Sequence, residues 1–265
     1  MSAYKNFIRP FHLEEPLDYM FYRPVAYGVI KTLQRLPMTP NLFSLLALVC
    51  AWGADIGIVV DQPQTMMLAG FGILFFSVLD CCDGMWARWK GNNYPYGDLV
   101  DMFIDLLAAI GHVTALVLLT LGRDGNVLLP ILSGIMLFVH ASLFHDRKAV
   151  WTATTQNQPD ERAAIVRKYR AELSRLRQQK CRLFSRFLIV CFLLFSGVQS
   201  AERELPQIDA ERLKKALPWW GIAAGTTHLT ILALALIINL PEIYYFFALV
   251  VANIFVAIAW LTERK

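Results

Sequence analysis

Six long apolar segments constrain this chain more than any other feature of its sequence. Each is close to the length of about 20 residues that an α-helix needs to cross a bilayer. The chain is 56% apolar and only 17% charged, a composition that excludes disorder and favours an integral membrane protein. We therefore expect an all-α fold with six transmembrane helices, in the segments 41–60, 66–86, 99–121, 127–144, 219–240 and 243–261.

A seventh apolar segment, residues 187–198, is about a dozen residues long, which is short for a membrane span. Basic residues both precede and follow it, so its two flanks favour the same side of the membrane. We expect this segment to lie at the interface or to pack against the helix bundle, which leaves six spans.

The distribution of Lys and Arg predicts the orientation of the spans. The first 41 residues carry five of them and residues 145–182 carry ten, whereas the loops 61–65 and 122–126 carry none and one. Loops rich in Lys and Arg stay in the cytoplasm. We expect the N-terminus, the active site and the central basic stretch on that side, and six spans also place the C-terminus there. The net charge of +4 follows this topology and requires no nucleic-acid partner.

Two segments outside the spans complete the expected organisation. In residues 1–40, apolar side chains recur near helical spacing, as in an amphipathic helix at the membrane surface. Residues 146–218 form a cytoplasmic or interfacial helical insertion, whose basic face suits either anionic lipid headgroups or solvent. The membrane part divides into residues 41–145, with four helices, and residues 219–265, with two.

Four aspartates lie near the end of one apolar segment and the start of the next: Asp80, Asp83, Asp101 and Asp105. Their spacings of three and four place the members of each pair on one face of a helix. Carboxylates near hydrocarbon are costly unless they are solvated, paired or bound to a cation, and four together repel one another. All-oxygen ligands favour Mg²⁺ or Mn²⁺, so the sequence predicts a two-metal site for phosphoryl transfer.

Small and basic residues accompany these carboxylates. Gly84 and Ala87 share a helix face with the first aspartate pair, so a bulky ligand can approach the backbone there. Arg88, one turn beyond Gly84, offers a forked donor for phosphate. Gly97 opens the second helix, where the backbone can come close to a ligand or a neighbouring helix.

The pattern D-x2-D-G-x2-A-R-x8-G-x3-D-x3-D is met at every specified position from Asp80 to Asp105, and it resembles the motif of the CDP-alcohol phosphotransferase (CDP-alcohol phosphatidyltransferase) family. The resemblance implies an enzyme of phospholipid biosynthesis that transfers a substituted phosphoryl group from a CDP-linked alcohol to a second alcohol and releases CMP. It assigns two divalent ions to all four aspartates and makes Asp105 the general base as well. Residues that it assigns to the CDP moiety are Gly84, Ala87, Arg88, Gly97, Asn41 and Ser44, of which Asn41 suits helix capping equally well.

The resemblance leaves the donor open. CDP-diacylglycerol with a small alcohol acceptor is the favoured pair, since bacterial-type members most often use it. The alternative is transfer from CDP-choline or CDP-ethanolamine to diacylglycerol, whose enzymes the N-terminal Pro16-Leu17-Asp18-Tyr19 resembles faintly. In both cases membrane lipids are partners. The resemblance also implies a homodimer, which the sequence itself neither supports nor opposes.

Two alternatives come from other classes of protein. An intramembrane prenyltransferase also uses Asp-rich motifs and Mg²⁺, but the last three apolar segments here contain no Asp for its second motif. A transporter or other non-enzymatic membrane binding protein would not require the framework of glycines and Arg88. Outside the motif we expect Asp55 and Asp61 to be solvated. We expect interhelical hydrogen bonds at His112, His140 and His228.

Overall fold

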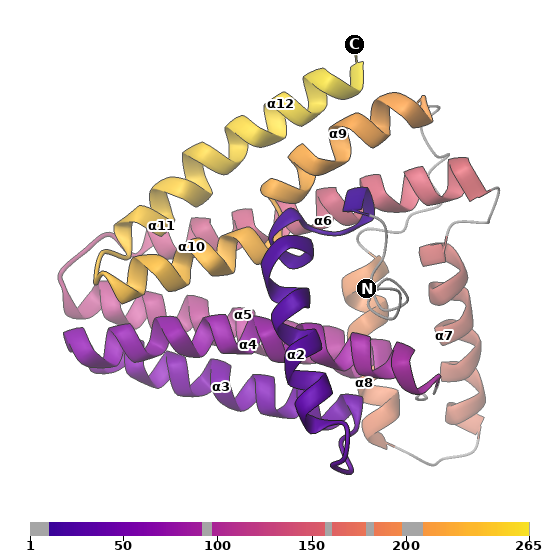
Figure 1. Ribbon diagram of the computed structural model, residues 1–265, viewed down its shortest axis with the longest axis horizontal. Coiled ribbons are helices and arrows are strands. Elements are labelled where there is room, and N and C mark those ends of the chain that lie inside the picture. The colour runs from indigo at the N-terminus through magenta and orange to yellow at the C-terminus, as the bar shows by residue number, and fades with distance from the viewer. Residues whose placement is uncertain (1–10, 92–96, 157–160, 179–182, 198–208, 265) are drawn as a thin grey trace.

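The computed structural model describes residues 11–91, 97–156, 161–178, 183–197 and 209–264, and within these ranges every regular element is a helix. Six helical stretches of the described residues are long and apolar enough to cross a membrane, which confirms the all-α fold with six candidate spans. In Figure 1 the first four of them run roughly along the long axis of the molecule, whereas parts of the last two are inclined to it. The first four spans are α3 (Pro40–Val60), α4 (Pro63–Lys90), α5 (Gly97–Gly122) and α6 (Leu128–Gln156).

The last two spans are each built from more than one helical piece. The fifth begins at Ala210 rather than at residue 219 and consists of α9 (Ala210–Ile222) and α10 (Gly225–Ile237). The chain leaves the helix at Ala223 and Ala224, where the ψ angle of Ala224 is extended. The sixth contains α11 (Glu242–Phe246), the π-helical turn η3 (Phe247–Val251) and α12 (Ala252–Arg264). The break in the fifth span gives α10 its own N-terminus inside the bundle.

Local sequence explains how the first two spans begin and end. The hydroxyl of Thr39 accepts a hydrogen bond from the backbone N–H of Leu42, and Pro40 occupies the first turn of α3, where no N–H is needed. Asp61 ends α3 with a left-handed φ of 54°, and Pro63 then starts α4. The tight connection makes α3 and α4 an antiparallel pair.

Glycine allows α4 and α10 to approach closely. A Cβ atom at position 70 would overlap the carbonyl oxygen of Ala233 and lie 2.6 Å from Cγ1 of Ile237. Small residues at a helix–helix contact are typical of membrane bundles, where backbones pack closely without a hydrophobic driving force. Gly70 is therefore a packing residue between the second and fifth spans.

The N-terminal segment forms helices that lie across the bundle. A short turn, η1 (Phe11–Leu13), is followed by the π-helical turn η2 (Asp18–Tyr22) and by α2 (Arg23–Leu33). Because Pro24 has no N–H to donate to the preceding turn, the regular α-helical pattern begins only at Arg23. In Figure 1, α2 crosses α4, against which it buries Ala26 and Ile30.

Two shorter helices, α7 (Glu161–Gln178) and α8 (Leu183–Gly197), run crosswise to the spans at one end of the bundle (Figure 1). Tyr169 and Leu173 of α7 pack with Ile189 of α8 and with Leu99 at the start of α5. The short apolar segment thus packs against the bundle, one of its two expected placements, and α8 is not among the six candidate spans.

Candidate active site

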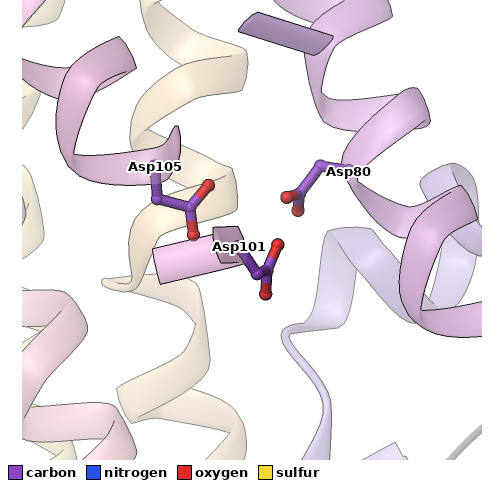
Figure 2. Close-up of side chains that lie close together, drawn as sticks. All are labelled: Asp80, Asp101 and Asp105. Carbon is purple, nitrogen blue, oxygen red and sulfur yellow. The ribbon is translucent and has the colours of Figure 1, made fainter. Parts of the chain in front are cut away.

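Three aspartates from two spans converge on one point. Asp80 comes from α4, and Asp101 and Asp105 come from successive turns of α5; each offers a carboxylate oxygen within 4.8 Å of the others. Figure 2 shows the three carboxylates facing one another across the space between the helices. Helix α3 packs against both α4 and α5 and so sets their relative positions. The one-turn spacing of Asp101 and Asp105 is what lets one helix supply two of the three groups.

The fourth motif aspartate, Asp83, is held by α3. It is buried one turn beyond Asp80, and its Oδ2 accepts a hydrogen bond from the hydroxyl of Ser44 at 2.6 Å. Its charge also interacts with that of Asp80, and its side chain shares a hydrogen bond with that of Asp101. The short distance is that of a bond to an ionised acceptor. Ser44, which the sequence suggested for nucleotide contact, orients an aspartate in this structure.

The carboxylates are concentrated where uncompensated negative charge is costly. Asp80 and Asp101 are half-buried, and Asp105 is exposed although it is well inside the third span. An exposed carboxylate that faces two half-buried ones borders a space that solvent or a substrate can reach. Repulsion among these groups is relieved by a cation between them. Three converging carboxylate oxygens form a donor set that fits a hard divalent ion.

The remaining motif residues surround this point in different ways. The guanidinium of Arg88 lies over Gly84: a Cβ atom at position 84 would be 3.4 Å from Nη1 of Arg88. Ala87 is half-buried, and Gly97 is the first residue of α5. Asn41 is exposed in the first turn of α3, where Thr39 is the cap residue.

Sequence reasoning missed two acidic residues of the N-terminal segment. Glu15 accepts a hydrogen bond from the backbone N–H of Thr226 (2.6 Å), and Asp18 accepts one from its hydroxyl (2.9 Å), so both are held by the N-terminus of α10. Asp18 interacts electrostatically with Asp80, and Glu15 with Asp105. No local pattern predicts this contact, since more than 200 residues separate its partners.

Burial and the charge of Asp18 raise the pKa of Glu15 to about 8, against the opposing effect of its hydrogen bonds from Thr226. Burial also raises the pKa of Asp18, which the nearby Arg23 opposes. Gly221 allows this segment to lie so close to α9, because a Cβ there would be 2.8 Å from Cδ of Pro16. The N-terminal segment therefore adds two largely buried acidic side chains to the wall of the site, and Glu15 is largely protonated below about pH 8.

The expectation that Asp55 and Asp61 are solvated is wrong for Asp55 and incomplete for Asp61. Asp55 is not simply solvated: its Oδ1 lies 2.6 Å from Nδ1 of His112, because both side chains are in the bundle interior between α3 and α5. Asp61 is partly exposed and forms an ion pair with Arg123. The interhelical hydrogen bonds of the histidines are confirmed by the His112–Asp55 pair and by His140 and His228, whose ring nitrogens are 3.1 Å apart.

Comparison with known protein families gives one match. A family model described as CDP-alcohol phosphatidyltransferase matches residues 37–263, which include the four motif aspartates and all six candidate spans except the last residue of the sixth. The segment with Glu15 and Asp18 lies before the matched range. No curated protein matches the chain.

Proposed function

Because the chain belongs to the CDP-alcohol phosphatidyltransferase family, whose members transfer a substituted phosphoryl group from a CDP-alcohol, we propose that its donor is CDP-diacylglycerol and its acceptor a small alcohol. The products are a phospholipid and CMP. The family match favours this transferase over the prenyltransferase and over the non-enzymatic binding protein or transporter. The distribution of Lys and Arg supports a cytoplasmic active site and cytoplasmic termini.

The convergence of Asp80, Asp101 and Asp105 is the observation that carries this proposal. Together with Asp83 they would hold two divalent ions, Mg²⁺ or Mn²⁺, which when bound would neutralise the charge of the substrate diphosphate. Arg88, with Gly84 and Ala87 beside it, would hold the CDP phosphates at the end of α4. Gly97 and Asn41 would line the nucleotide side, and Ser44 would act there through Asp83.

Asp105 is suited to the role of general base because it is the exposed member of the cluster. It takes the proton of the acceptor hydroxyl as that oxygen attacks the phosphorus that carries the lipid alcohol. A new P–O bond forms, the bond from this phosphorus to the bridging oxygen of the diphosphate breaks, and CMP leaves with the electron pair. The site lies within the spans, so a lipid substrate can enter sideways from the bilayer.

A second candidate is transfer from CDP-choline or CDP-ethanolamine to diacylglycerol. The N-terminal Pro16-Leu17-Asp18-Tyr19, which faintly resembles the enzymes of that reaction, favours it. The family resemblance further suggests a homodimer.

Release of CMP tests the proposal directly. The purified chain in lipid nanodiscs is given CDP-diacylglycerol with a panel of neutral, anionic and cationic alcohols, or CDP-choline or CDP-ethanolamine with diacylglycerol, in Mg²⁺, Mn²⁺ or EDTA. We expect metal-dependent CMP release with CDP-diacylglycerol and one class of alcohol. Turnover only with CDP-choline or CDP-ethanolamine would establish the second candidate instead, and no release with any pair would contradict both.

A further inference from the structure

Helix α7 has one buried apolar side and one exposed basic side. Its buried residues recur at spacings of three and four, as on one side of an α-helix, and they are Val166, Tyr169, Leu173 and Leu176. The exposed Lys and Arg residues form what we call the basic face: Arg167, Lys168, Arg170, Arg175 and Arg177. The apolar side is covered by the bundle, so the basic face is the part of α7 that is open to a partner.

The positive charge of this face is not balanced within the helix. Six residues of α7 are basic and two are acidic. One of the acids, Glu172, lies 3.7 Å from Arg175, whose side chain is 68% exposed, and such a surface pair contributes little. Helix α7 therefore keeps an excess of positive charge on one exposed side, which attracts an anionic partner.

The adjoining helix α8 marks the edge of the bilayer. Phe187 of α8 packs edge-to-face on Phe103 of α5, with ring centroids 5.9 Å apart. Phe103 is the fifth residue of the third candidate span, whose 24 residues measure about 36 Å against a hydrocarbon core of about 30 Å. It therefore lies close to the boundary between hydrocarbon and headgroups. The exposed Leu183 and Phe187 of α8 suit that boundary, where interfacial helices insert apolar side chains.

Helix α7 lies beside the same boundary. Leu99, the first residue of the third span, packs with Tyr169 of α7 and with Ile189 of α8. In Figure 1 both helices run crosswise to the spans, which is the direction of the membrane surface. The diameter of a helix with its side chains is about 10 Å, close to the distance over which a surface potential acts at physiological salt. The headgroups are thus within electrostatic reach of the basic face.

We propose that the basic face of α7 binds the anionic headgroups of the membrane that holds the protein. Each Lys or Arg near an anionic membrane surface strengthens binding by about fivefold. A soluble acidic protein or a nucleic acid carries the same sign of charge, but α8 and the spans hold α7 next to lipid, whose local concentration is therefore much higher. The inference does not depend on which donor or acceptor the enzyme uses.

Hydrogen exchange of the backbone amides of α7 tests this contact, because headgroups that hold the helix oppose its local opening. The purified chain is placed in nanodiscs of neutral phosphatidylcholine, or of phosphatidylcholine mixed with anionic phosphatidylglycerol. We expect α7 to exchange roughly tenfold more slowly in the anionic nanodiscs at low salt. High salt screens the charges and should remove the difference.

The variant Arg170→Gln with Arg177→Gln should lose most of this difference, because it removes two cations of the basic face. The matched control, Lys214→Gln with Lys215→Gln, removes two exposed cations of α9 and should keep the wild-type difference in α7. All four side chains are exposed, and the salt dependence of the wild type tests the proposal without either variant.

Equal exchange of wild-type α7 in neutral and anionic nanodiscs would overturn the inference and leave the basic face in contact with solvent. Slower exchange with added RNA or an acidic peptide, and none with anionic lipid, would also overturn it and assign the face to a soluble partner. Neither readout requires turnover. Failure of the proposed function would appear as absence of CMP release in every nanodisc and would leave the exchange result unchanged.

Discussion

Replacement of Ser44 by alanine tests whether the hydroxyl of α3 supports the metal site. The hydroxyl donates to Oδ2 of Asp83 at 2.6 Å, and both residues are buried, with 4% and 7% of their surface exposed. Ser44→Ala removes one oxygen atom and leaves the helix unchanged. The Asp83 carboxylate then loses the Ser44 hydroxyl and keeps its hydrogen bonds with the backbone of Gly84 and with Asp101, so its orientation is fixed less firmly.

The expected size of the effect follows from the type of bond. A hydrogen bond to a charged group contributes about 1.5–3 kcal/mol, and each 1.4 kcal/mol corresponds to about tenfold in affinity. Loss of a residue that orients a metal ligand costs about 10- to 100-fold in metal affinity or activity. We therefore expect Ser44→Ala to raise the Mg²⁺ concentration for half-maximal CMP release by about 10- to 100-fold, with most of kcat retained at saturating metal.

A Mg²⁺ titration of CMP release in nanodiscs measures this change. The matched control is Ser133→Ala, another buried serine, whose hydroxyl has no hydrogen-bond partner among the described residues and which lies on α6. We expect the control to titrate like the wild type. Wild-type Mg²⁺ dependence in a folded Ser44→Ala variant would refute the argument, and so would an equal shift in the control.

Three further predictions follow from single side chains. Asp105→Asn should abolish CMP release while the melting temperature stays at or above the wild-type value; normal turnover would exclude Asp105 as the base. Burial raises the pKa of Glu15 from 4.5 to about 8, so between these two pH values the folded state binds more protons than the unfolded state. The free energy of unfolding therefore falls as the pH rises from 4.5 to about 8. Melting temperatures in EDTA at about pH 6 and about pH 9 should therefore show a decrease that Glu15→Gln reduces, and an identical decrease in both proteins would contradict this. Gly70→Ala should lower the free energy of unfolding by about 1–3 kcal/mol, because the added methyl group would overlap α10. The control is Gly53→Ala, whose methyl group meets no atom within 4 Å and should not lower it. Equal stability of the two variants would exclude close packing at Gly70.

The spans and the chemistry of the motif could be predicted from the sequence because both depend on local periodicity. A stretch of about 20 apolar residues must form a helix in lipid, since its backbone groups have no other hydrogen-bond partners. The spacing of Asp101 and Asp105 likewise places both on one face of any helix. The expected start of the fifth span at residue 219 was nine residues late, because the polar first turns of α9 continue the same helix.

Contacts between distant segments were decided by the tertiary structure alone. Asp55 was expected in solvent, yet it pairs with His112, 57 residues away, because α3 and α5 happen to face each other at that level. Ser44 fits a nucleotide-binding pattern in the sequence, but the packing of α3 on α4 turns its hydroxyl to Asp83.

Six helical spans and a carboxylate motif can be inferred from single segments of the sequence, because hydrophobic length and helical spacing do not depend on distant residues. The tertiary structure alone decided that Glu15 and Asp18 join the wall of the site through Thr226, since this requires the break before α10 and the close approach at Gly221. Electrostatic and hydrogen-bond partners depend on distance in space, and a linear pattern does not contain that distance.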